Sequence, residues 1–199
     1  MRSEQWLSEL VLEGQHVILR PLLLADAQAL FEAAADGELW NLWFTGVPSS
    51  ETVRSYVEDA LAAKAQGLAL PFVVLDKATQ AVIGSTRFCN ADNTNQRVEI
   101  GYTWYAKRFQ KTLVNTECKY LLLSHAFEKL SAIAVEFRTH WHNQTSRKAI
   151  ARLGAKQDGV LRNHQRMDDG SYRDTVVFSI TDSEWLAVKA SLSYKLNGG

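Results

Sequence analysis

The 199-residue sequence predicts an α/β protein with a mixed β-sheet. Two observations support this prediction. Short alternating apolar segments follow one another closely through the first half of the chain, as in antiparallel hairpins. A strongly apolar helical segment then lies between two strand-like segments, as in a crossover between parallel strands. Because no repeat, low-complexity tract or Pro/Ser-rich linker interrupts the chain, we expect one domain over residues 1–199.

The first third of the chain predicts one strand and two helices. Residues 16–24 form the strand, and apolar positions at helical spacing follow until Gly37. The second helix is expected to begin at a cap on Ser49 or Ser50 and to stop at Gly67. Its apolar stripe consists of Val53, Tyr56, Val57, Ala60 and Leu61.

Three strands with short connections are predicted next, over 70–75, 81–89 and 97–105, with a polar turn at 92–96. The third strand alternates, which predicts that its two faces differ. One face is expected to carry Val98, Ile100, Tyr102 and Trp104, and the other Glu99, Gly101 and Thr103.

The second half of the chain alternates between helices and strands. Residues 115–130 are the strongest helix candidate, and they are apolar on most faces. A helix from Asn143 to Leu153 is expected to be capped by Asn143 and closed by Gly154. The remaining elements are strands over 133–139, 155–163 and 173–180 and a helix over 182–195.

The overall composition excludes several classes of function. Lys+Arg and Asp+Glu both number 22, so there is no basic excess of the kind that nucleic-acid binding requires, although a local basic strip can exist. Cys89 and Cys118 have no metal-site spacing and indicate core thiols in a reducing compartment. No segment approaches the roughly 18 apolar residues of a membrane span, and the first residues are polar. We therefore expect a soluble, cytoplasmic protein without a metal and without a nucleic-acid or membrane partner.

The junction between strand 97–105 and the helix that starts near Asn115 is a candidate phosphate site. A helix N-terminus presents unpaired N–H groups and the positive end of the helix dipole. Lys107, Arg108 and Lys111 add positive charge there. The alternative is that these residues are simply solvated, because many strand–helix junctions are built this way.

A second candidate contact lies at Asn143 and Ser146. Both residues fit helix capping, and the same positions can also present an amide and a hydroxyl to a ligand between the two strand–helix junctions.

Six segments together resemble the GNAT N-acetyltransferase superfamily, and within it the Rim-type branch that contains the ribosomal-protein N-terminal acetyltransferases. The segments follow the family's order over nearly the whole chain. They are LRPL at 19–22, IGSTRF at 83–88, VEIGYTWY at 98–105, VNTECKYLLLSHAFE at 114–128, NQTSRKAIARLGAKQDGVLR at 143–162 and DGSYRDTVVFSITDSEW at 169–185.

The resemblance implies a sheet of about seven strands, flanked by helices, whose two central parallel strands splay apart to hold acetyl-CoA. The family's phosphate loop has the pattern Arg/Gln-x-x-Gly-x-Gly/Ala and aligns with residues 110–115, where Leu113 and Asn115 replace the small residues. A second departure is His140, where related sequences often carry an acidic residue. The implied cofactor contacts are Tyr102, Thr103, Trp104, Gln110, Lys111, Thr112, Leu113, Val114, Asn115, Thr116, Asn143 and Arg147.

The implied reaction is direct attack of a neutral amine on the thioester of acetyl-CoA in a ternary complex. Glu99 is the candidate base, and its alternative role is to pair with Arg87 or Arg97 or to bond a loop. Ser146 is the candidate acid toward the leaving thiolate. A backbone N–H near residues 102–104 would stabilise the oxyanion. Alternative residues for proton transfer are Tyr102, Tyr172 and His164, whereas His125 is expected to be structural.

The acceptor is left open between a peptide N-terminus and a small-molecule amine. Residues 40–44, Trp104 and Trp141 either wall its pocket or belong to the core. A homodimer is expected if the surface of the C-terminal helix is mostly apolar. The alternative functions are a non-catalytic acyl-CoA-binding or sensor module on the same fold, and an unrelated α/β enzyme with another phosphate ligand.

Overall fold

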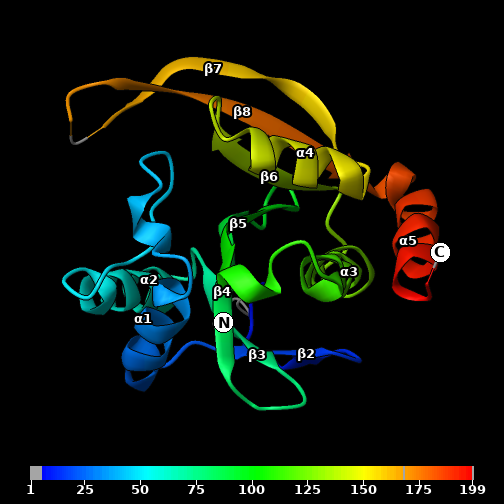
Figure 1. Ribbon diagram of the computed structural model, residues 1–199. Coiled ribbons are helices and arrows are strands. Elements are labelled where there is room, and N and C mark those ends of the chain that lie inside the picture. Colours follow the sequence, from blue (N-terminus) through cyan, green and yellow to red (C-terminus); the bar gives the residue numbers. More distant parts are fainter. Residues whose placement is uncertain (1–5, 168, 199) are drawn as a thin grey trace.

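The computed structural model describes residues 6–167 and 169–198, so the polar residues 1–5 lie outside the described part of the chain. The described residues form an eight-stranded mixed sheet with helices on both faces (Figure 1), which confirms the predicted α/β class. The strands are β1 (Leu12–Glu13), β2 (Val17–Pro21), β3 (Leu70–Asp76), β4 (Val82–Asp92), β5 (Arg97–Tyr105), β6 (Ala134–His140), β7 (Lys156–Arg166) and β8 (Tyr172–Thr181). The helices are α1 (Ala27–Ala35), α2 (Val53–Ala65), α3 (Leu113–Glu128), α4 (Gln144–Leu153) and α5 (Asp182–Leu196).

The strand order is β1-β2-β3-β4-β5-β6-β8-β7, and β5 and β6 are the parallel neighbours at its centre. Their pairing runs only from Arg97↔Ala134 to Glu99↔Glu136, although both strands continue further. The central pair therefore separates beyond Glu99, as predicted. The sheet has eight strands rather than about seven because the two-residue β1 pairs with β2.

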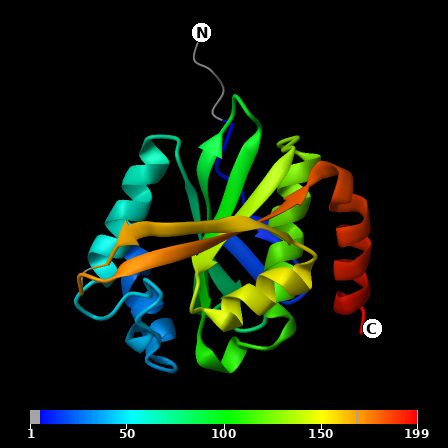
Figure 2. The same cartoon turned by 90° about the horizontal axis from the view of Figure 1, so that it is seen from above.

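Helices α1 and α2 lie on one side of the sheet, and α3 and α5 lie on the other (Figure 2). Each side has its own buried cluster. Leu30 of α1 and Val57 of α2 pack with Trp104 on the first side. Leu122 of α3 and Leu192 of α5 pack with Val98 on the second. The strand β5 thus contributes to both cores, which places its two faces in different surroundings.

Helix boundaries follow the caps that the local sequence provides. Asn143 Oδ1 accepts the N–H of Ser146 (3.0 Å), and Gly154 closes α4 with φ 106°, as predicted. Helix α3 begins at Leu113, two residues before the expected start, because Thr112 Oγ1 accepts the N–H of Val114 (3.3 Å). The expected cap of α2 at Ser49 or Ser50 is wrong, since Thr52 precedes that helix.

Cys89 and Cys118 are free and buried, as predicted. Burial raises the pKa of the Cys118 thiol to about 12 and also raises the pKa of Cys89. Both side chains therefore stay protonated near neutral pH and act as apolar core groups.

The outer face of α5 is mixed. Leu186 and Tyr194 are exposed there, but so are Asp182, Ser183 and Ser191. The mostly apolar surface on which the dimer expectation depends is not found on this helix.

Candidate active site

A β-bulge in β5 lies at the point where β5 and β6 have separated. Arg87 pairs with Gly101 and Ser85 pairs with Trp104, so β5 has one residue more than β4 between these pairs. Tyr102 in this bulge has φ 50°, which is uncommon for a residue other than glycine. The bulge therefore marks a strained backbone segment at the centre of the sheet.

The bulge also reverses the faces of β5. Val98 packs on the α3 side, whereas Trp104 packs on the α1/α2 side. Tyr102 also lies on the α1/α2 side, stacked on Arg87. The predicted alternation is therefore wrong from Tyr102 onward, because an extra residue shifts the period by one.

Glu99 lies on the α1/α2 side, just where the parallel pairing ends. Its side chain is buried, and its Oε2 accepts a hydrogen bond from Asn90 Nδ2 (2.7 Å) and lies 3.5 Å from Arg138 Nε. Burial is the largest influence and raises the pKa of Glu99, against the opposing effects of Asn90 and Arg138. A buried carboxyl with a raised pKa at a strand separation is a candidate for proton transfer.

Gly101 provides the space that the Glu99 carboxylate occupies. A Cβ at position 101 would lie 3.0 Å from Glu99 Oε1 and 3.1 Å from Cys89 Sγ. Any larger residue would therefore displace the carboxylate.

Three arginines, Arg97, Arg138 and Arg173, lie near the carboxylates of Glu99 and Glu136. Arg138 also donates to Glu136 Oε2 (3.0 Å), and Glu136 in turn binds Arg97 (2.6 Å). Arg173 lies close enough to lower the pKa of Glu99. The predicted alternative that Glu99 pairs with Arg87 or Arg97 is wrong, because its partners are Arg138 and Asn90.

Arg87 stands between two tyrosines. Its guanidinium carbon lies 3.8 Å from the ring centre of Tyr102 and 5.1 Å from that of Tyr56 in α2. Burial is the largest influence on Tyr102 and raises the pKa of its hydroxyl, which therefore keeps its proton at neutral pH. Tyr102 can consequently act as a hydrogen-bond donor beside Arg87.

His140 ends β6 on the same side of the sheet. Its Nδ1 accepts the backbone N–H of His142 (3.1 Å), so the proton of the neutral ring is on Nε2. That Nε2 is buried and has no partner among residues 6–167 and 169–198. Burial, followed by Arg173 and His142, lowers the pKa of His140, so the ring stays neutral at pH 7. His140 is thus a candidate N–H donor rather than a base.

The aromatic residues of the α1–α2 connection divide between site and core. Trp43 packs edge-on against His140 with ring centres 4.9 Å apart, and Phe44 lies 6.5 Å from the same ring. Trp40 stacks on Phe31 of α1. Trp104 is buried, with its Nε1 bonded to Tyr56 (3.3 Å), and Trp141 is exposed. Of these aromatic residues, Trp43 and Phe44 therefore lie nearest to the candidate site.

A separate polar group lies on the α3 side of the bulge. Lys119 Nζ donates to Thr103 Oγ1 (2.6 Å) and contacts Thr86 Oγ1 (3.4 Å), and these two hydroxyls are 2.7 Å apart. Thr103 therefore faces away from Glu99, contrary to the predicted shared face. Burial lowers the pKa of Lys119 to about 8.

The buried ammonium of Lys119 predicts a pH-dependent stability. The pKa of this group is lower when folded (about 8) than its ordinary value of 10.5, so its charge destabilises the fold below pH 8 and this cost declines as pH rises toward 10.5. Between pH 7 and 9.5, the free energy of unfolding of the natural protein is expected to rise by about 2 kcal/mol relative to that of Lys119→Met. Urea titrations of both proteins at the two pH values measure it. A constant difference between the proteins would contradict the assignment.

A basic pocket of about 340 Å³ lies at the N-terminus of α3. It is lined by Lys111, Thr112, Leu113 and Thr116, together with Arg152 from α4 and Lys195 from α5, whose Nζ bonds Arg152 O (2.7 Å). Three cations around a helix N-terminus match the needs of a diphosphate or phosphate group. The residues present therefore fit the phosphates of acetyl-CoA.

The backbone of this loop explains how it tolerates the absent glycines. Lys111 has φ 61°, the conformation that favours glycine, whereas Leu113 is the first residue of α3. The position whose backbone conformation favours glycine is therefore Lys111 rather than Leu113. Gln110 Nε2 donates to Tyr105 O (3.0 Å) and holds the loop against β5. Val114 is buried in the core and Asn115 is half-buried in the first turn.

The predicted residues of α4 form a local group. Asn143 caps the helix through Ser146 N, and the side chains of both residues are half-buried. Arg147 stacks on Trp141 (4.2 Å) and donates to its carbonyl oxygen (3.2 Å). No hydrogen bond joins the Ser146 hydroxyl to any residue that the structure describes, so the hydroxyl is free for a ligand.

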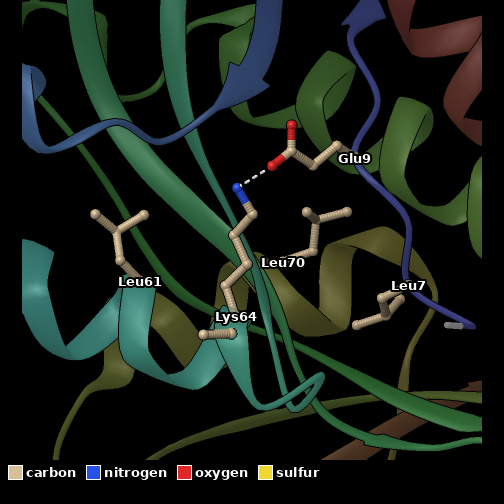
Figure 3. A pocket seen from close by; sticks show the side chains of 6 residues that line it. Leu7, Glu9, Leu61, Lys64 and Leu70 are labelled. Carbon is tan, nitrogen blue, oxygen red and sulfur yellow. Dashed lines mark ion pairs between the residues drawn. The ribbon is translucent and has the colours of Figure 1, made fainter.

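Another pocket, of about 360 Å³, lies between the N-terminal segment and α2, away from the residues above (Figure 3). Leu7, Leu61 and Leu70 form its apolar wall, and Lys64 forms an ion pair with Glu9 across it. Its charges are paired with each other, which is typical of a packing defect between segments rather than a reactive site.

Comparison with known proteins identifies the family. The Acetyltransferase (GNAT) domain family matches residues 16–156. The chain therefore belongs to the GNAT acetyltransferases, which are acetyl-CoA-dependent N-acetyltransferases. The sequence-based resemblance is confirmed, including its Rim-type relatives.

Three similar proteins illustrate the relationship. The uncharacterized N-acetyltransferase p20 of Bacillus licheniformis is 26% identical over 86% of this chain and 96% of its own length. The ribosomal protein uS5-alanine N-acetyltransferase of Escherichia coli (strain K12) is 24% identical over 60% and 61%. The crystal structure of a GCN5-related N-acetyltransferase from Brucella melitensis is 29% identical, covers 94% of this chain and 86% of its own, and superposes with a TM-score of 0.85.

No helix within 6–167 or 169–198 is long and apolar enough to cross a membrane. The same residues contain no cluster of three or more His, Cys, Asp or Glu side chains that could hold a metal ion.

Proposed function

We propose that this protein transfers the acetyl group of acetyl-CoA to a primary amine by direct attack in a ternary complex. The observation that supports this most is the buried Glu99 with a raised pKa at the separation of β5 and β6. The basic pocket at the N-terminus of α3 supports the cofactor half of the proposal. The two sites lie on opposite sides of β5, and the pairing of β5 with β6 ends between them at Glu99.

Acetyl-CoA supplies an activated acetyl thioester. Lys111, Arg152 and Lys195 hold its phosphates together with the N–H groups of the first turn of α3. Asn143 bonds the pantetheine arm, and the backbone of Tyr102, Thr103 and Trp104 lines its inner end. Residues 110–116 and Arg147 complete the cofactor contacts that we propose.

Glu99 accepts the proton of the attacking amine, directly or through water. Because a primary amine is mostly protonated at pH 7, a proton must be removed from it before it attacks. Backbone N–H groups of the bulge, and the Nε2–H of neutral His140, stabilise negative charge that develops on the thioester oxygen. Ser146 or Tyr102 donates the proton to the departing thiolate. A thiol pKa of about 8.5 makes this last step the least demanding.

Calorimetric titration with acetyl-CoA tests the cofactor site. We expect one site per chain with an affinity on the order of micromolar. Arg152→Gln is expected to weaken binding about tenfold and to reduce its salt dependence, because one phosphate contact is lost. Arg54→Gln, an exposed change on α2, is the matched control and leaves affinity unchanged.

Two outcomes would contradict the proposal. Absence of heat on titration would show that the α3 pocket does not hold the phosphates. Binding without thiol release for any amine would support the non-catalytic acyl-CoA-binding alternative instead. The two free buried thiols, Cys89 and Cys118, suit the cytoplasmic location that we propose for this activity.

A further inference from the structure

We propose that the acceptor amine carries a carboxylate a few atoms from its nitrogen, and that Arg87 and Arg173 bind this carboxylate beside Glu99. The inference rests on the proposed transfer to an amine and specifies the substrate class for that site.

The surroundings of Glu99 have more positive than negative groups. Arg138 is the arginine in contact with Glu99, and it shares Glu136 with Arg97. Arg87 and Arg173 form no ion pair with any carboxylate of residues 6–167 and 169–198. Arg87 is thus left without a paired carboxylate, and Arg173 has only the more distant charge of Glu99, which Arg138 already contacts. Unpaired charges in partly buried sites are costly unless a ligand compensates them.

Arg87 is 5% exposed, which is unusual for an arginine without an anionic partner. Its Nε is buried without a hydrogen-bond partner among the residues that the structure describes. The rings of Tyr56 and Tyr102 cover its planar faces, at 5.1 Å and 3.8 Å. Stacking on both faces leaves the edge of the guanidinium, which carries the N–H groups, as the part that a ligand can reach.

Arg173 of β8 is held by one of its nitrogens. Its Nε donates to Thr175 Oγ1 (3.0 Å), and the same oxygen contacts His164 Nδ1 (3.1 Å). Burial lowers the pKa of Arg173, while Glu99 and Tyr102 act in the opposite direction. Arg173 and Arg87 therefore both neighbour the Glu99–Tyr102 region, from different strands. Guanidinium groups that both lie near Tyr102 but come from different strands suit the binding of a carboxylate.

The phosphates of acetyl-CoA do not account for these arginines. Arg87 stacks on Tyr56 of α2, on the side of the sheet opposite to α3 and α5 (Figure 2). The phosphate pocket lies at α3 and has its own three cations. The two positive groups therefore serve different ligands.

An anionic acceptor also suits the charges around Glu99. Positive charge around the amine disfavours its ammonium form and so eases the loss of the proton to Glu99. The same charge would repel a purely cationic acceptor, such as a polyamine. A carboxylate on the acceptor resolves this conflict, because it binds the arginines while the amine is deprotonated.

Matched acceptor pairs test the inference through thiol release. The small pair is β-alanine and β-alaninamide, and the peptide pair is Ala-Glu-Ala-amide and Ala-Gln-Ala-amide. The natural protein is expected to prefer the acid in at least one pair by about 10- to 100-fold in kcat/KM. Arg87→Gln and Arg173→Gln each reduce this acid-to-amide ratio at least several-fold. Arg87→Lys retains part of the ratio, and the exposed Arg54→Gln leaves it unchanged.

The outcomes separate this inference from the proposed function. Turnover of acids and amides with ratios near one in both pairs would overturn the inference and leave the transferase proposal intact. If no amine is turned over, calorimetry with N-acetyl-β-alanine and N-acetyl-β-alaninamide, with CoA present, decides the question without catalysis. Binding of the acid alone, lost in Arg173→Gln, supports the inference, and equal or absent binding of both compounds overturns it.

Discussion

Glu99→Gln lowers kcat by about 100- to 10,000-fold and leaves the affinity for acetyl-CoA nearly unchanged, if Glu99 is the base. The substitution preserves the size of the side chain and keeps an oxygen for Asn90 Nδ2, which is 2.7 Å away in the natural protein. It removes the ability to accept a proton, together with the negative charge that lies 3.5 Å from Arg138 Nε. The effect should therefore appear in turnover rather than in cofactor binding, and stopped-time thiol assays with calorimetry measure the two separately.

The pH profile gives the same test in a second form. Burial raises the pKa of Glu99 above its ordinary value of 4.5, and the base must be ionised to act. Activity of the natural protein should therefore fall as pH decreases through a value above 4.5. In Glu99→Gln this fall should shift to higher pH, toward the pKa of the acceptor amine, because only amine that is already neutral can then attack.

Glu136→Gln is the matched control. Glu136 pairs with Glu99 across the parallel strands, but two arginines hold it and lower its pKa. A small change in kcat for this variant, beside a large one for Glu99→Gln, would assign the effect to Glu99 itself. Equal losses in both variants, or no loss at Glu99, would remove Glu99 from the mechanism.

Glu117→Ala is expected to lower the free energy of unfolding by about 3–6 kcal/mol, a large share of the stability of a typical domain. Glu117 is buried in α3, and its carboxylate accepts three backbone N–H groups: Gln15 (2.6 Å), His16 (2.8 Å) and Val17 (3.0 Å). Alanine would leave all three donors without their partner at the start of β2. Urea denaturation followed by circular dichroism measures the loss.

Gly14 leaves the space that the Glu117 carboxylate needs beside the start of β2. A Cβ at Gly14 would lie 2.5 Å from Glu117 Cδ, so the turn closes directly on the carboxylate. Glu117→Gln retains one acceptor oxygen and should lose about half as much stability as Glu117→Ala. A loss below about 1 kcal/mol for alanine would show that water replaces the carboxylate.

Most of the fold could be predicted because periodicity and turn residues act locally. Asn143 and Gly154 gave both ends of α4 correctly, and the polar turn near residue 94 lies between β4 and β5 as expected. The alternation in β5 predicted the wrong side of the sheet from Tyr102 onward, because the bulge inserts one residue without changing the hydrophobic composition. A positive φ at a tyrosine has no sequence signature comparable to that of glycine.

The site was predicted only in part, because its members come from separate strands. Glu99 was identified from its strand position and from the family resemblance, and its role stays a prediction. Arg138, His140 and Arg173 were missed as site residues, since β6 and β8 become neighbours only through the topology. The alternation of Glu136, Arg138 and His140 on one face of β6 was the available signal.

The most direct test of the account is thiol release by the purified protein with acetyl-CoA and the four matched acceptors. We expect amine-dependent release that Glu99→Gln abolishes almost completely, while acetyl-CoA still binds at one site per chain. Release that is independent of the amine, or equal in the natural protein and in Glu99→Gln, would contradict it.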